Sequence, residues 1–120
     1  MVKSEEQLKK VFYIEKTDFL RSMMEFALKA HGAEVYTVKT IENNFYLLDD
    51  LAPDLIIFDV ESCREQLLKL SDYSAKAVLV GVGSEIERVE VQKMVKFFLL
   101  KPYEAKNIAS RILGLLDQKN

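Results

Sequence analysis

The stretch Pro53-Asp-Leu-Ile-Ile-Phe-Asp-Val-Glu61 decides the fold of this chain. A turn dipeptide opens it, an apolar run follows at 55–58, and the run ends at a carboxylate, Asp59. A short continuous apolar run bounded by turn signals predicts a strand buried on both faces of a parallel sheet. Ligands of open α/β sheets bind beyond the carboxyl ends of the strands, so Asp59 would lie where chemistry is placed. From this stretch alone, a loop or helix-capping role for Asp59 is favoured, because aspartate is common in both.

Length and composition describe one soluble globular domain. The 120 residues are 49% hydrophobic and 30% charged, with a net charge of −2, which suits a single core and excludes a disordered chain. The charge offers no basic footprint for nucleic acid, and no apolar run is long enough to span a bilayer. The charged start of the chain is unlike a signal peptide, and a single cysteine, Cys63, allows no internal disulfide, so we expect a cytoplasmic protein.

Strand and helix patterns alternate along the chain. Strands are predicted at 11–14, 33–40, 55–58, 75–82 and 97–100. Helices are predicted at 18–31, 41–51, around 67–70, from Ser84 onward with Ile86, Val89 and Met94 on the inner face, and at 104–117. Residues 1–10 are expected to form a partly helical leader before a domain at 11–118. This alternation predicts right-handed crossovers and a single-domain α/β three-layer sandwich with a parallel sheet.

Three predicted strands end at a charged residue. Glu15 follows the first strand, Asp59 the third and Lys101 the fifth. In a flavodoxin-like strand order, 2-1-3-4-5, the first and third strands are neighbours, so two carboxylates and an ammonium would meet in one shallow cleft. Pro102 follows Lys101, and a cis bond there would aim the lysine. Together these residues indicate a site, although each alone is weak.

Over residues 11–116 the sequence resembles the receiver domain of bacterial two-component response regulators, which has a CheY-like (βα)5 fold. The stretch that ends at Asp59 is similar to the family's phospho-acceptor strand, which implies that Asp59 takes a phosphoryl group from a histidine kinase. The segment Phe-Leu-Leu-Lys101-Pro102 is similar to the end of the family's fifth strand. By the same resemblance, Phe98 falls at the aromatic switch position.

The sequence departs from the family's pattern at several positions. The resemblance implies a pair of acids that hold Mg²⁺ after the first strand, whereas this acidic pocket contains Glu15 and Lys16. It also implies a Thr or Ser at the end of the fourth strand, and this position falls on Gly81, which has no hydroxyl. Cys63 replaces a proline four residues after the acceptor, and is best interpreted as a buried small residue.

The formal charges of the predicted site bear on metal binding. Two carboxylates, Glu15 and Asp59, would face two ammonium groups, Lys16 and Lys101. The site would then be neutral and would lack the excess negative charge that attracts Mg²⁺. Lys16 would place its ammonium near the vacated cation position, and Glu15 and Asp59 would hold Mg²⁺ weakly at most. In the simpler alternative, Lys16 points into solvent and Glu15 still binds some Mg²⁺.

Three functions are weighed. We favour an atypical receiver, or pseudo-receiver: a protein-interaction module rather than an enzyme, without a cofactor, whose phosphorylation at Asp59 is lost or weakened. The alternatives are a working receiver that uses Mg²⁺, and a small flavodoxin-like nucleotide or flavin binder. The last is disfavoured because residues 15–18 contain no glycine to cradle a phosphate.

The resemblance also implies the kind of partner. A histidine kinase, an output protein or a second copy of the chain would dock on the face of the fourth helix, fifth strand and fifth helix. On that helix Glu85, Glu87, Arg88, Glu90 and Lys93 are expected to lie outward. Neither nucleic acid nor a membrane is expected as a direct partner.

Overall fold

The computed structural model describes residues 8–117. Its strands are β1 (Lys10–Ile14), β2 (Glu34–Val38), β3 (Leu55–Asp59), β4 (Val78–Gly83) and β5 (Phe97–Leu100). Its helices are α1 (Asp18–Ala30), α2 (Phe45–Leu51), α3 (Leu67–Ser71), α4 (Glu85–Val91) and α5 (Ala105–Gly114). Short 3-10 helices are η1 (Glu61–Gln66), η2 (Asp72–Ala75) and η3 (Leu115–Asp117). Most of the expected leader lies outside the described residues, and Lys10 already belongs to β1.

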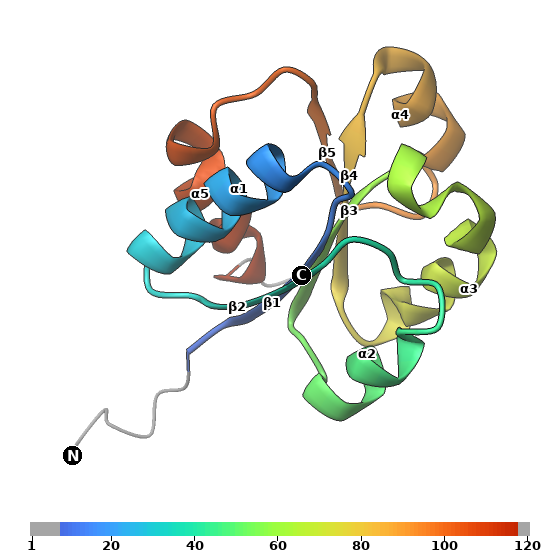
Figure 1. The fold of residues 1–120 in the computed structure, drawn as a ribbon, viewed down its shortest axis with the longest axis horizontal. Helices are drawn as coiled ribbons and strands as arrows, with labels where there is room; N and C mark the ends of the chain where they lie inside the picture. The colour runs from blue at the N-terminus through green and yellow to red at the C-terminus, as the bar shows by residue number, and fades with distance from the viewer. Residues whose placement is uncertain (1–7, 118–120) are drawn as a thin grey trace.

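The five strands form one parallel sheet in the order β2-β1-β3-β4-β5. This order, the single domain and the three layers confirm the predicted fold. Helices α1 and α5 cover one face of the sheet, and α2, α3 and α4 cover the other (Figure 1). Because every strand runs in the same direction, all five carboxyl ends reach the same edge.

The continuous apolar run in β3 is explained by two separate cores. Leu55 and Ile57 pack in the cluster under α1 and α5, whereas Ile56 and Phe58 pack in the cluster under α2, α3 and α4. All four side chains are fully buried. A strand between two helical layers has no solvent face, so its sequence does not alternate.

The helices on the α2–α4 side differ from the predicted ones. Helix α2 begins at Phe45 rather than at 41, because the preceding residues form a turn in which Asn43 takes a left-handed backbone conformation (φ 65). The expected helix around 67–70 is a short α3 between two 3-10 helices. Within residues 8–117, no helix has the length and apolar character needed to cross a bilayer.

Helix α4 is oriented differently from the prediction. Ser84 and Glu87 form the expected capping box at its start. However, the helix ends at Val91, which is its buried residue, while Ile86 and Val89 are 77% and 53% exposed. The prediction that Ile86 and Val89 face inward was therefore wrong.

Candidate functional site

Three strand ends bring a carboxylate, a second carboxylate and an ammonium together. Asp59 is the last residue of β3, and Glu15 and Lys101 follow β1 and β5 directly. The Lys101 ammonium lies 2.7 Å from Oδ1 of Asp59 and 3.4 Å from Oε1 of Glu15. Glu15 and Asp59 are buried, at 0% and 2% exposure, beneath a lysine side chain that is 30% exposed. The Lys101-Pro102 peptide bond is cis.

Electrostatics hold Lys101 in its charged form. Burial alone would lower the pKa of its ammonium. The hydrogen bond and charge of Asp59, followed by the charge of Glu15, outweigh this effect and raise the pKa of Lys101 above its ordinary value. The ammonium is thus a fixed positive charge between two buried carboxylates.

The remaining carboxylate oxygens accept hydrogen bonds from protein groups. Oδ2 of Asp59 accepts bonds from the Ser62 hydroxyl at 2.6 Å and from the Ser62 amide at 3.0 Å. Oε2 of Glu15 accepts a bond from the Thr17 amide at 3.1 Å, and Oε1 accepts one from the Tyr13 hydroxyl at 3.2 Å. Every oxygen of the two carboxylates therefore has a donor within the protein.

Two tyrosines extend this network to the loop after β5. The hydroxyls of Tyr13 and Tyr103 are 2.9 Å apart, and Tyr13 is fully buried. Burial, followed by the charge and hydrogen bond of Tyr103 and then by Glu15, raises the pKa of Tyr13 far above its ordinary value. Tyr13 therefore remains a neutral hydroxyl beneath the carboxylates.

Lys16 lies apart from this buried group. Its ammonium pairs with Glu61 at 3.2 Å, where both side chains are more than half exposed. Its amide donates a hydrogen bond to the Ser62 hydroxyl oxygen at 2.9 Å. The structure thus agrees with the simpler alternative, in which Lys16 points into solvent. With both carboxyls ionised, the buried group has a formal charge of −1, because two carboxylates face one ammonium, so the predicted neutral count was wrong.

Mg²⁺ is the ion that the resemblance implies, and the oxygen ligands that this site offers do not fit it. Mg²⁺ prefers near-octahedral oxygen ligands, including one or two available carboxylates. Here the carboxylate oxygens already accept bonds from Lys101, Ser62, Thr17 and Tyr13. Among residues 8–117 no three His, Cys, Asp or Glu side chains gather as a metal-binding group. Asp18, the next acid along the chain, is 72% exposed and pairs with Arg21.

The register between β3 and β4 shows that Gly81 is not the residue of β4 that lies beside Asp59. In β4, Gly81 is paired with Phe58, whereas Val82 is paired with Asp59. Paired residues of parallel strands point to the same face, so Val82 and Asp59 share the α1–α5 face and Gly81 lies on the opposite one. An added Cβ at Gly81 would lie 2.9 Å from the Phe98 ring. The residue beside Asp59 is therefore Val82, which like Gly81 has no hydroxyl.

Phe98 packs in the second core and Cys63 is buried within it. Phe98 is partly buried against the cluster under α2, α3 and α4. Cys63 is fully buried, and this burial, together with the charges of Asp59 and Glu15, raises the pKa of its thiol well above the ordinary value. Cys63 is therefore a buried small residue, as the sequence predicts.

Three residues of the site were missed in the sequence: Ser62, Tyr13 and Tyr103. Ser62 carried a signal, because an aspartate often accepts a hydrogen bond from a backbone amide a few residues later. Tyr13 precedes Glu15 by two residues in an extended strand, so the two side chains leave the same face. Tyr103 gave no comparable local signal, because its partner Tyr13 is distant in the sequence.

Comparisons with known proteins bear on the fold of the chain. No protein-family model matches the sequence, and no curated protein sequence matches it. Among solved structures, an orphan response regulator of H. pylori is similar at 22% identity and a TM-score of 0.77, covering 90% of this chain and 96% of its own. A response regulator from Thermotoga maritima is similar at 16% identity and a TM-score of 0.80, covering 93% of this chain and 100% of its own.

A third similar structure is described as an atypical orphan response regulator with a phosphorylation-independent regulatory mechanism. It is 21% identical with a TM-score of 0.76, and the match covers 92% of this chain and 98% of that one. At these identities the likeness shows the fold, which is that of CheY-like receiver domains.

Proposed function

We propose that this chain is an atypical receiver domain, a signalling module that binds a protein partner and in which phosphorylation of Asp59 is lost or weakened. Its fold is that of receiver domains, and Glu15, Asp59 and Lys101 meet at one edge of the sheet. The module acts by binding rather than by catalysis, because its charged groups are joined to one another in a closed network.

The observation that carries this proposal is the state of the Asp59 carboxylate. Asp59 is 2% exposed, and both of its oxygens accept hydrogen bonds, from Lys101 on one side and Ser62 on the other. Phosphoryl transfer relies on positioning and on charge stabilisation, usually with metal ions. A carboxylate whose lone pairs are occupied, next to a poor set of Mg²⁺ ligands, is a weak nucleophile.

A second candidate function is a working receiver, and one observation favours it. The buried group carries a formal charge of −1 once Lys16 is placed outside it. Excess negative charge attracts cations, so Mg²⁺ could compete for Asp59 if the Ser62 hydrogen bond opened.

The partner surface is assigned to α4, β5 and α5 in this proposal. Ile86 and Val89 on α4 and Leu100 on β5 are 77%, 53% and 47% exposed. Helix α4 and strand β5 are in contact, so these exposed apolar side chains lie on neighbouring elements and are our candidates for contact with a partner. Of the charges expected to lie outward, Glu85, Arg88 and Glu90 are 61%, 41% and 42% exposed. Glu87, by contrast, is 17% exposed and pairs with Arg64.

Phosphodonor labelling tests the proposal directly. Purified protein is incubated with acetyl phosphate and Mg²⁺, and phosphate on Asp59 is measured by intact mass, with Asp59→Asn as the background control. We expect no label above that control. Saturable, Mg²⁺-dependent labelling that is lost in Asp59→Asn would instead establish the working receiver.

A further inference from the structure

One side chain, Ser62, joins the 3-10 helix η1, which follows β3, to the loop after β1. Its hydroxyl donates a hydrogen bond to Oδ2 of Asp59 at 2.6 Å, and its amide donates to the same oxygen at 3.0 Å. The hydroxyl oxygen also accepts the Lys16 amide proton at 2.9 Å. Ser62 therefore contacts both the acceptor-position carboxylate and the backbone of the neighbouring loop.

We propose that Ser62 is a positioning residue that holds Asp59 and the β1–α1 loop together, in the manner of a built-in replacement for a bound divalent cation. A cation at this edge would join carboxylate oxygens of both loops. Here the link is made by hydrogen bonds, and the Lys101 ammonium occupies the other Asp59 oxygen. This inference goes beyond the proposed function, because it concerns what fixes the carboxylate, whether or not phosphate ever reaches it.

The chemistry of the link requires a hydroxyl. The group must donate a proton to a carboxylate and at the same time accept one from an amide. A serine or threonine hydroxyl does both, whereas an alanine side chain does neither. The bond to the carboxylate is charge-assisted, which makes it the stronger of the two. Ser62→Ala should therefore release both contacts of the hydroxyl and leave only the backbone amide of residue 62 as a donor to Oδ2, whereas Ser62→Thr should keep them.

Hydrogen exchange at a single amide is the first test. In Ser62→Ala the Lys16 amide loses its acceptor, so we expect its exchange to accelerate by about three- to tenfold. In Ser62→Thr it should remain as slow as in wild type. The Val60 amide, which donates to the Val82 carbonyl at 2.9 Å, serves as a folding control in every variant. Unchanged Lys16 protection in a folded Ser62→Ala protein would overturn the proposal.

Mn²⁺ binding, followed by water proton relaxation, is the second test. Lys16→Asp adds an acid where the resemblance implies one, yet it leaves Oδ2 of Asp59 bonded to the hydroxyl and the amide of Ser62. We therefore expect Lys16→Asp alone, and Lys16→Asp with Ser62→Thr, to bind Mn²⁺ weakly. Lys16→Asp with Ser62→Ala should bind about tenfold more tightly, because the stronger of the two donors that compete for Oδ2 is removed.

The outcomes distinguish this inference from the proposed function. Lys16→Asp alone binding Mn²⁺ as tightly as the double variant with alanine would overturn the role of Ser62, provided that protection of the Val60 amide shows both variants to be folded. Phosphodonor labelling of the wild-type protein would overturn the proposed function and leave the exchange result standing.

Discussion

At the scale of single residues, the sheet register decides which side chains can reach Asp59. Side chains alternate between the two faces of a strand, so an error of one position transfers a residue to the opposite face. Gly81 illustrates this: it lies under Phe98 on the α4 side, and Val82 lies beside Asp59. A threonine at 81 would therefore add bulk under Phe98 rather than a hydroxyl to the site.

Gly81→Ala should destabilise the protein. The new Cβ would lie 2.9 Å and 3.0 Å from two ring atoms of Phe98, so the ring or the strand must shift, at a cost of about 1–3 kcal/mol. Gly114→Ala is the matched control, because a Cβ there meets nothing within 4 Å and should stabilise the helix by up to about 1 kcal/mol. Urea unfolding of both variants measures the difference, and equal stability would contradict the close packing.

The residues that could be predicted from sequence are those at strand ends. Glu15, Asp59 and Lys101 are each the charged residue at which an apolar run stops, and strand direction alone brings them to one edge. Ser62 and the outward course of Lys16 depend on how the loops turn after each strand. Those turns are set by hydrogen bonds between distant segments, such as the Lys16 amide with Ser62, and apolar patterning carries no information on them.

At the scale of elements, strands were predicted better than short helices. A strand between two helical layers is marked by its own continuous apolar run, as in β3. Helix α4 spans only 7 residues, so few positions establish its buried face. The prediction extended the helix to Met94, which packs against the second core but lies beyond the end of α4. Within α4 the buried residue is Val91, and not the predicted Ile86 and Val89. Its capping box was predicted because that signal is local.

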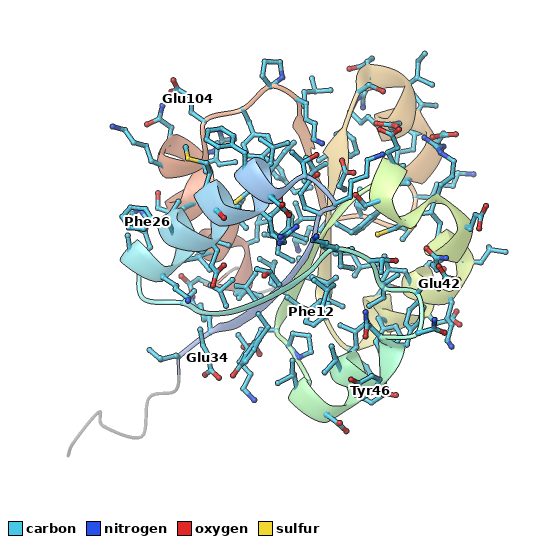
Figure 2. All side chains as sticks on the ribbon, viewed as in Figure 1. Phe12, Phe26, Glu34, Glu42, Tyr46 and Glu104 are labelled. Atoms are coloured by element: carbon cyan, nitrogen blue, oxygen red, sulfur yellow. The ribbon has the colours of Figure 1, made fainter. Side chains whose placement is uncertain are left out.

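The outward face of α4 should mediate self-association if the partner is a second copy. Ile86→Glu places a charge among the exposed apolar residues and should weaken a dimer by at least about fivefold. Tyr46→Glu on α2 is the control, because Tyr46 is 58% exposed on the outer side of a different helix (Figure 2). Sedimentation over a range of concentrations compares the two variants. A dimer that Ile86→Glu leaves intact would exclude this face, and a strictly monomeric protein would restrict it to other partners.

At the scale of the whole molecule, one network of hydrogen bonds and ion pairs connects the carboxyl ends of three strands. It runs from the Lys16 amide through Ser62, Asp59 and Lys101 to Glu15. Tyr13 then links Glu15 to Tyr103 before α5. The strand order could be predicted from alternating patterns, but this network could not, since it joins residues separated by up to 90 positions.

The network makes the stability of the fold sensitive to alkaline pH. The pKa of buried Tyr13 is raised in the folded state, chiefly by burial, whereas the pKa of a tyrosine in the unfolded chain is about 10. Below that pH tyrosine is neutral in both states, and its contribution to stability is fully present. Above it the unfolded chain releases a proton that the folded chain retains, so the free energy of unfolding falls. The raised pKa of Lys101 acts in the same direction.

We therefore expect stability to decline steeply from about pH 10 upward, by as much as about 1.4 kcal/mol per pH unit for each such group. Urea unfolding of wild type and Tyr13→Phe between about pH 8 and about pH 11 measures the slope. At neutral pH, Tyr13→Phe should be less stable than wild type, because the hydrogen bond to Glu15 is lost. Above about pH 10 its stability should decline less steeply, because one ionisable group has been removed. Tyr46→Phe, which removes an exposed hydroxyl from α2, should follow the wild-type slope. Parallel slopes for wild type and Tyr13→Phe would show that Tyr13 ionises as readily in the folded protein as in the unfolded chain, and that the hydroxyl beneath Glu15 is not closed off from solvent.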